Sequence, residues 1–402
     1  MQFSCCHDTH SIVSFVVLVS LLFTPIISSK DFREKNGTSI AGNKSKNMKL
    51  INAQLRKINK PFVKSIKSPD DDIIDCVLFH LQPAFDLPEL REKISLIQVP
   101  ELPKTHAKAG TNSEIKQLWH SKGESCPNGT IPIKRTTASD ISIFKSAKKY
   151  SRKNLVSANY EHATGYVQGE FHGANAELNV WKPYISSNDF SRSQIWVLSY
   201  VGANLANSVE AGWEVYKDSR PRLFIFWTAD GYQSGCYNLV CSGFVQTTQK
   251  FSLGSAIDPV STYNGVQCHV AFMIWKDPKS GDWWLKVGTE VIGYWPKSLF
   301  TSLQGNATTI EYGGEVYSHD LADNHTTTQM GSGHFPDEDF KKAAFIRKLA
   351  VIDQHNELKP VSNLNLFAPR PNCYDVRKGR GNPDIWGDYI FFGGPGYNPN
   401  CL

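Results

Sequence analysis

Several features that identify common protein classes are missing from this chain. Its net charge of +5 is spread over 402 residues without a basic stripe, so we expect no nucleic-acid partner. The segment "MGSGH" does not match the G-x-S-x-G frame of a serine hydrolase, and "GGPG" is typical of a turn rather than a phosphate loop. No repeat of fixed period is present, which argues against a solenoid.

Metal-ligand spacing is missing too. A turn-rich segment offers five candidate ligands, His319, Asp320, Asp323, His325 and His334. Their spacing matches no zinc-hydrolase pattern, and histidines in such a segment usually lie at the surface. We therefore predict that the protein uses no metal and no organic cofactor.

Long apolar runs are absent except at the N-terminus. Residues 11–29, "SIVSFVVLVSLLFTPIISS", form an apolar core that ends in small residues, as a secretory signal peptide does. Pro25 and the shortness of the run argue against a retained membrane anchor. We therefore expect a signal peptide at residues 1–29 and a secreted protein of the cell wall, apoplast or vacuole, with no membrane contact once the signal is removed.

Cysteine usage agrees with secretion, because disulfides are the default in an oxidising compartment. The cysteines beyond the signal are Cys76, Cys126, Cys236, Cys241, Cys268, Cys373 and Cys401. Adjacency suggests the pairs 76–126, 236–241 and 373–401, which leaves Cys268 as a buried thiol in a strand-like run. Glycosylation sequons at Asn36, Asn43, Asn128, Asn306 and Asn324 fit a secreted chain.

Composition shifts divide the chain into parts. A polar leader at residues 30–69, with one short helix at 48–58, precedes a small disulfide-stapled module at 70–150. The basic, Ser-rich segment 145–157 then provides a site for proteolytic nicking. From about residue 155 to 402, short aromatic runs alternate with Gly and Pro turns, and the clearest hairpin is "CHVAFMIWKDPKSGDWWLKVG". This pattern predicts an all-β sandwich or barrel.

Two strand-like stretches, "VEAGWEVY" at 209–216 and "IEYGGEVY" at 310–317, share an unusual glutamate and glycine frame. Side chains alternate faces along a strand, so Glu210, Gly212, Glu214 and Tyr216 share one face, and Glu311, Gly313, Glu315 and Tyr317 do likewise. In one sheet, the four carboxylates would converge on a glycine-lined surface. Two carboxylates about 4 Å apart repel by about 4 kcal/mol at an effective dielectric near 20, so one is protonated when the other is ionised. Such a pair suits acid–base hydrolysis; the alternative is four solvent-facing strand residues.

The chain resembles the neprosin family of plant secreted glutamic peptidases. The resemblance rests on stretches such as "IIDCVLFHLQPAFDLP", "RLFIFWTADGYQSGCYNLVCSGFVQ", "HTTTQMGSGHFP" and "WGDYIFFGGPGYNPNC", and it runs from about residue 70 to the end. It implies an antiparallel sandwich of the concanavalin A-like, jelly-roll type, preceded by an α+β activation propeptide that is shed in acid. It also implies cleavage after proline, with Glu210 and Glu315 as the catalytic pair and Glu214 and Glu311 as supporting or exposed residues.

We therefore expect a secreted, monomeric glutamic endopeptidase that acts on Pro-containing peptides and is inhibited by its own propeptide. Aromatic faces suit a pyrrolidine ring, so the candidates to line the substrate site are Trp213, Tyr216, Trp227 and Tyr317. Two alternatives stay open, namely a non-catalytic β-sandwich that binds cell wall or glycan, and a glycosidase, because paired carboxylates also hydrolyse sugars.

Overall fold

The computed structural model describes residues 49–92, 94, 99–104, 116–141, 159–200, 206–319, 325–379 and 383–401. The expected signal peptide, the segment 145–157 and the sequons at Asn36, Asn43 and Asn324 lie outside these residues. Residues 49–58 form a helix, as predicted. In the described part of the chain, every helix is too short or too polar to cross a membrane.

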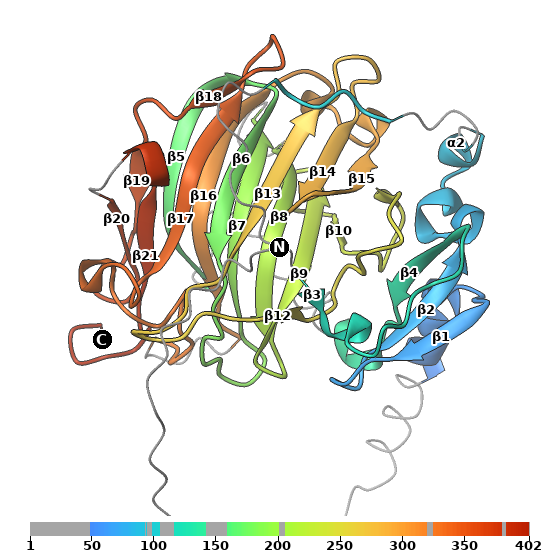
Figure 1. Ribbon diagram of the computed structural model, residues 1–402, viewed down its shortest axis with the longest axis horizontal. Helices are drawn as coiled ribbons and strands as arrows, with labels where there is room; N and C mark the ends of the chain where they lie inside the picture. The colour runs from blue at the N-terminus through green and yellow to red at the C-terminus, as the bar shows by residue number, and fades with distance from the viewer. Residues whose placement is uncertain are drawn as a thin grey trace, which may run out of the picture.

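The main domain is built from two antiparallel sheets that pack against each other (Figure 1). The first sheet has seven strands in the order β10-β9-β8-β7-β16-β5-β19. Their bounds are β5 Tyr160–Phe171, β7 Phe190–Ser199, β8 Asn207–Tyr216, β9 Arg220–Thr228, β10 Cys236–Tyr237, β16 Ala307–Tyr317 and β19 Asn365–Phe367. The prediction of an all-β antiparallel sandwich is confirmed, and both glutamate-containing stretches are strands of this one sheet.

The second sheet has nine strands, eight of them in the order β11-β15-β14-β13-β6-β17-β21-β20, with β18 paired to β17. Their bounds are β6 Gly173–Asn179, β11 Val245–Gln246, β13 His269–Lys276, β14 Trp283–Val287, β15 Glu290–Trp295, β17 Ala344–Ile352, β18 Leu358–Pro360, β20 Asp375–Lys378 and β21 Ile390–Gly393. The predicted hairpin is the β13–β14 pair. Short helical turns complete the domain: η5 Lys297–Leu299, η6 Ser302–Gln304, η7 Pro336–Glu338 and α4 Pro383–Trp386.

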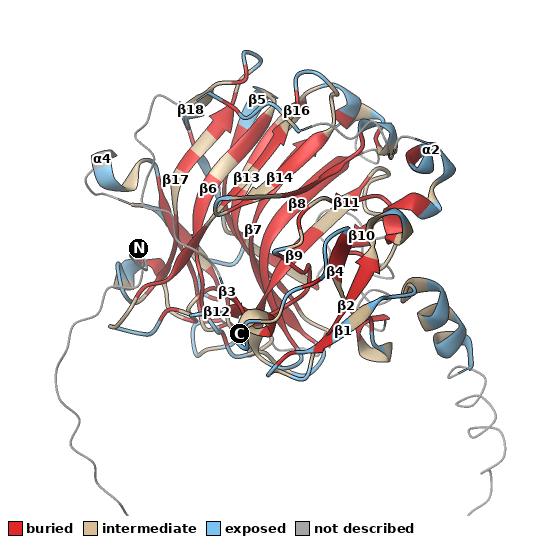
Figure 2. Cartoon of the chain, turned by 45° about the vertical axis from the view of Figure 1, so that its right-hand side comes forward, coloured by how far each residue is buried: buried red, intermediate tan, exposed pale blue. Residues whose placement is uncertain are grey.

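The strands of both sheets are largely buried (Figure 2), and the apolar core lies between the two sheets. On β8 the inward residues are Val209, Ala211, Trp213 and Val215, all at 0% exposure. Because strand side chains alternate, this packing turns the residues between them, including Glu210, to the outer face of the seven-stranded sheet. The hydrophobic pattern thus decides which face carries the glutamates.

A smaller module lies beside the sandwich (Figure 1). Its sheet joins β1 (Lys64–Lys67), β2 (Ile73–Leu78) and β4 (Thr130–Lys134). The remaining elements are η1 Phe79–Leu81, η2 Pro83–Asp86, α2 Pro88–Arg91, β3 Lys116–Gln117 and η4 Leu118–His120. Because β1 falls in the segment expected to be a polar leader, this sheet begins before residue 70. β3 pairs with β12 (Ile257–Asp258) of the main domain, which ties the two parts together.

All three predicted disulfides are present. Cys76 joins Cys126 in the small module, Cys236 joins Cys241, and Cys373 joins Cys401. Cys268 is buried, as predicted, but its sulfur belongs to a disulfide, so the expectation of a leftover thiol is wrong. Of the sequons in the described residues, Asn128 is exposed, and Asn306 is half-buried with its amide oxygen 2.8 Å from Nε2 of His172.

We expect Gly212→Ala to lower the free energy of unfolding by about 3 kcal/mol or more, as overpacking against rigid neighbours does. A Cβ at residue 212 would lie 2.0 Å from the backbone oxygen of Ser193, so β8 would have to move away from β7. The control is Gly169→Ala on β5, where the added Cβ meets only the ring of Phe171 at 2.9 Å, and that ring can turn aside. Urea unfolding measures both; equal midpoints for the two variants would contradict the close approach of β7.

Candidate active site

The outer face of the seven-stranded sheet carries a three-by-three arrangement of residues on β8, β7 and β16. The pairing registers define three cross-strand rows: Glu210, Trp196, Glu311; Gly212, Gln194, Gly313; and Glu214, Arg192, Glu315. Glutamates occupy the four corners, glycines flank the centre, and Gln194 is the central residue. Gly212 and Gly313 allow neighbouring strands to approach closely, because a Cβ at these positions would lie 2.0 Å from the backbone oxygen of Ser193 and 2.4 Å from that of Ala163.

Glu210 is buried, at 2% exposure, and is held by neutral donors. Its Oε1 accepts hydrogen bonds from the hydroxyls of Ser208 at 2.7 Å and Tyr232 at 2.8 Å, and its Oε2 accepts one from Nε2 of Gln194 at 3.0 Å. Among the described residues it makes no ion pair. Burial, together with the nearby charge of Glu315, raises the pKa of Glu210 from 4.5 to about 7. Glu210 therefore carries a proton in mildly acidic solution.

Glu315 has a different environment because a cation contacts it. Nη1 of Arg192 lies 3.0 Å from Oε1 of Glu315, and Nε of the same guanidinium lies 2.5 Å from Oε2 of Glu214. The guanidinium also stacks between the rings of Phe190 and Phe224, at 3.8 and 4.3 Å from their centroids. Arg192 is thus fixed on four sides and supplies a counter-charge to Glu315.

The two remaining corner glutamates are not simply solvent-facing. Glu214 is fully buried and is bonded by Arg192 and by the hydroxyl of Tyr237. Glu311 is half-buried, and its Oε1 accepts a hydrogen bond from Thr164 at 2.5 Å. Burial raises the pKa of Glu311. Both residues therefore support the arrangement, and the alternative of four exposed strand glutamates is wrong.

One expected detail is different. Glu210 and Glu315 lie on strands separated by β7. Two strand spacings of about 4.8 Å put their α-carbons about 10 Å apart across the sheet, before the offset along the strands is added. Each carboxyl has its own donors, and Gln194 stands between them. The two groups are coupled through space, because the charge of Glu315 contributes to the raised pKa of Glu210.

The four aromatic candidates divide between the two faces of the sheet. Tyr216 and Tyr317 lie on the glutamate face, one row beyond Arg192. Trp213 and Trp227 do not: both pack into the sandwich, where the indole of Trp213 donates to the carbonyl of Asn179 at 3.0 Å. Their strand positions are odd-numbered, like the core residues of β8, so the prediction that they line the site is wrong.

The structure adds site residues that the sequence argument missed. Arg192, Gln194 and Trp196 come from β7, and His162 from β5 places Nδ1 4.0 Å from Oε2 of Glu315. The amide oxygen of Gln194 is buried without a hydrogen-bond partner in the described structure, so it is available to a ligand. The alternation of "SRSQIW" carries the signal for the β7 residues, but only knowledge that β7 lies between β8 and β16 makes it usable.

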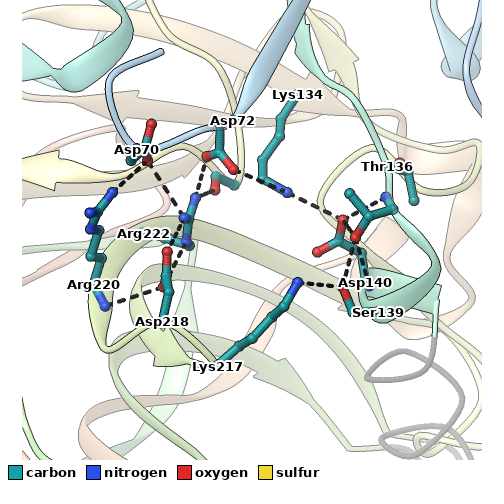
Figure 3. A network of polar contacts seen from close by, with 12 residues as sticks. Asp70, Asp72, Lys134, Thr136, Ser139, Asp140, Lys217, Asp218, Arg220 and Arg222 are labelled. Carbon is teal, nitrogen blue, oxygen red and sulfur yellow. Dashed lines mark hydrogen bonds and ion pairs between the residues drawn. The ribbon is translucent and has the colours of Figure 1, made fainter. Parts of the chain in front are cut away.

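The small module reaches this face at its edge. The β1–β2 turn brings Asp72 to Arg222 of β9, which pairs with Glu214 and so extends the lower row (Figure 3). Asp140 accepts a hydrogen bond from the hydroxyl of Tyr216 at 3.0 Å. The module therefore contacts the main domain where the glutamate face ends.

The histidine-rich segment is engaged in other contacts. Nδ1 of His325 lies 2.7 Å from Oε1 of Glu161, and Nδ1 of His334 lies 2.7 Å from Oε1 of Glu338. A cluster of His325, Cys373 and Cys401 has metal-like spacing, but its two sulfurs form a disulfide. Asp320 and Asp323 lie outside the described residues.

Comparisons with known proteins identify two family segments. Residues 65–175 match the family described as "Neprosin activation peptide", and residues 187–395, more than half of the chain, match the family described as "Neprosin". The first match begins with β1 of the small module.

Three solved structures are similar in part. Scytalido-glutamic peptidase with a peptide-based transition state analogue shares 9% identity over 59% of this chain and 98% of that one, with a TM-score of 0.32. SCP-B, a member of the Eqolisin family of peptidases in complex with the tripeptide Ala-Ile-His, shares 8% identity over 59% and 98%, with a TM-score of 0.31. The CBM40 of a Ruminococcus gnavus IT-sialidase shares 8% over 40% and 79%, with a TM-score of 0.16.

The raised pKa of Glu210 predicts a pH-dependent free energy of unfolding. Because the folded-state pKa rises from 4.5 to about 7, the contribution is fully present below pH 4.5 and is lost as the pH rises through 7. It amounts to roughly 3 kcal/mol. Denaturant unfolding between pH 5.5 and 8 should show a steeper fall for the native protein than for Glu210→Gln. Glu290→Gln, which removes a surface carboxyl paired with Lys250, should keep the native slope; a Glu210→Gln slope equal to the native one would contradict the raised pKa.

Proposed function

The chain belongs to the neprosin family, and from this premise we propose that it is a secreted glutamic endopeptidase, made as a zymogen, that cleaves on the carboxyl side of proline. The observation that carries the proposal is the unlike pair on one sheet face. Glu210 is buried among neutral donors with a pKa of about 7, whereas Glu315 is ion-paired with Arg192. Two carboxyl groups in such different environments have different pKa values, so one can act as the general acid and the other as the general base.

In the proposed reaction, Glu315 is the base and Glu210 the acid. The Glu315 carboxylate takes a proton from a water molecule, whose oxygen bonds to the scissile carbonyl carbon, while Glu210 gives its proton to the carbonyl oxygen. When the C–N bond breaks, the leaving nitrogen takes the proton held by Glu315, and Glu210 recovers its own as the carbonyl re-forms. Each carboxyl thus ends the cycle as it began, and the amide oxygen of Gln194 is in place to accept a hydrogen bond from the water.

The preference for proline is supported by the aromatic surface beside the acid. Trp196 stands between Glu210 and Glu311 in the upper row, and Phe226 flanks Glu210 on β9. A pyrrolidine ring has no N–H to satisfy and packs well on an aromatic face. Trp196 and Phe226, rather than the core-facing Trp213 and Trp227, are therefore the aromatic candidates for contact with proline.

Activation in acid is supported by the carboxylates that hold the small module. Asp72 is ion-paired with Arg222 and lies 3.9 Å from Lys134 (Figure 3). Burial raises the pKa of Asp72 despite the nearby Arg222. Protonation in acid removes the charge that Arg222 attracts, so the module is held less tightly.

We expect Glu210→Gln and Glu315→Gln each to reduce kcat by at least about a hundredfold, since positioned acids and bases contribute that much. The assay acidifies the secreted precursor, follows loss of about the first 150 residues, and measures cleavage of Pro-containing peptides. Glu290→Gln is the matched control and should behave as the native protein. Native activity in either site variant would overturn the proposal, and a native protein that binds glycans but cleaves no peptide would favour the binding-module alternative.

We also expect the double variant Asp70→Asn/Asp72→Asn to release the module at a higher pH than the native precursor, because asparagine mimics the protonated carboxyl. The pH midpoint for appearance of the mature chain on a gel measures this. Asp71→Asn is the matched control, since the Asp71 side chain is 85% exposed and pairs with Lys67 of the same hairpin. An unchanged midpoint in the double variant would show that these aspartates do not hold the module.

A further inference from the structure

The lower row of the glutamate face continues beyond Glu214 to a basic residue. Arg222 of β9 pairs with Glu214 of β8, so the row reads Arg222, Glu214, Arg192, Glu315 across four neighbouring strands. Arg220 follows on the same face, beside Tyr216. A cationic pair therefore ends the row that begins at the proposed base.

In the precursor this pair is occupied by carboxylates of the small module (Figure 3). Asp72 is ion-paired with Nη1 of Arg222. Asp70 lies 3.5 Å from Nη2 of Arg222 and 3.8 Å from Nη1 of Arg220, with its side chain only 1% exposed. Both Asp70 oxygens lack a hydrogen-bond partner in the described structure, so charge alone holds this carboxylate. Arg220 and Arg222 thus bind acidic side chains of the small module, the segment that the proposed activation removes.

Loss of the module would leave the arginines under-compensated. Asp218 stays with the main domain and contacts Nη2 of Arg222 at 2.5 Å. Lys217, which bonds Ser139 of the module, would be freed with Arg220. Arg220, Arg222 and Lys217 would then outnumber the two carboxylates of the main domain beside them, Asp218 and Glu214. A positive surface of this kind attracts an acidic partner.

We propose that Arg220 and Arg222 form a substrate subsite of the mature protein that takes an aspartate or glutamate side chain about four residues from the scissile bond. The inference rests on the proposed peptidase function. Three strand spacings of about 4.8 Å separate Arg222 from Glu315, or about 14 Å. An extended peptide advances about 3.3 Å per residue, so a substrate that crosses the strands reaches the pair after about four residues. The module's aspartates fill the subsite in the precursor.

The test uses the activated protein and three peptides that each contain one proline. The peptides differ only in carrying Asp, Asn or Lys at one position four residues from that proline. Each is made in two versions, with the variable residue on the N-terminal or on the C-terminal side of the proline. At pH 5 an exposed aspartate, with a pKa of about 3.9, is ionised. In one of the two series, the Asp peptide should have a KM about tenfold lower than the Lys peptide, because the arginines make a charge-assisted contact with the aspartate. At pH 3 the aspartate is largely protonated, so the Asp and Asn peptides should have the same KM.

Two variants connect the preference to the arginines. Arg220→Gln and Arg222→Lys should each bring the Asp-to-Lys ratio of KM at pH 5 towards one. Arg220, whose side chain is 40% exposed, is the substitution less able to disturb folding. The matched control is Arg377→Gln, a 56% exposed residue on β20 that should keep the native ratio. Equal KM values for the three peptides, or a full preference in Arg220→Gln, would overturn the proposal.

Binding separates this inference from the proposed function. A labelled peptide of residues 68–74, "SPDDDII", is titrated by fluorescence anisotropy into the mature domain, with "SPNNNII" as its neutral counterpart. Tighter binding of the acidic peptide, abolished by Arg220→Gln and by high salt, supports the subsite even if no peptide is ever cleaved. Equal binding of both peptides by a protein that cleaves after proline would sink the subsite and leave the peptidase proposal intact.

Discussion

The site depends on one constraint, the antiparallel pairing of β7 with β8 on one side and β16 on the other. This pairing brings two distant stretches of chain into register, so that their glutamates become corners of one rectangle around Gln194. The inward packing of β8 turns the same glutamates away from the core. A slip of one residue in either pairing would exchange the faces and bury the carboxylates in the sandwich. The glycines of the middle row reinforce the register, because a side chain at Gly212 would collide with β7.

Charge on this face is arranged in alternation. Arg222, Glu214, Arg192 and Glu315 follow one another across four strands, so each buried charge has an opposite neighbour. Buried ions are costly unless they are paired and hydrogen-bonded. Glu210 is the exception among the catalytic candidates: within the described residues it has hydrogen-bond donors but no ion pair, and burial raises its pKa. The difference between two glutamates of identical chemistry is therefore a difference in what surrounds them.

The small module is held by two kinds of contact that respond differently to acid. The side-chain amide of Gln117 exchanges hydrogen bonds of 2.7 Å with the backbone of Ser252, and the amide of Gln82 exchanges hydrogen bonds of 3.1 and 2.8 Å with the backbone of Gln246. These contacts carry no titratable group. The contacts at the edge of the glutamate face depend on carboxylates. In the proposed release, acid therefore weakens first the carboxylate contacts at the edge of the glutamate face.

By itself, the sequence determined the β-rich class, the disulfides 76–126, 236–241 and 373–401, and the face on which each strand residue lies, because these follow from local alternation and adjacency along the chain. Its alternation left four candidate glutamates, and the resemblance to the neprosin family implied Glu210 and Glu315 among them. It did not determine that β7 lies between their strands, that Arg192 sits against one of them, or that Trp227 faces the core. Strand order and side-chain surroundings come from pairing between residues far apart in the chain, which no local pattern encodes, so only the tertiary structure decided them.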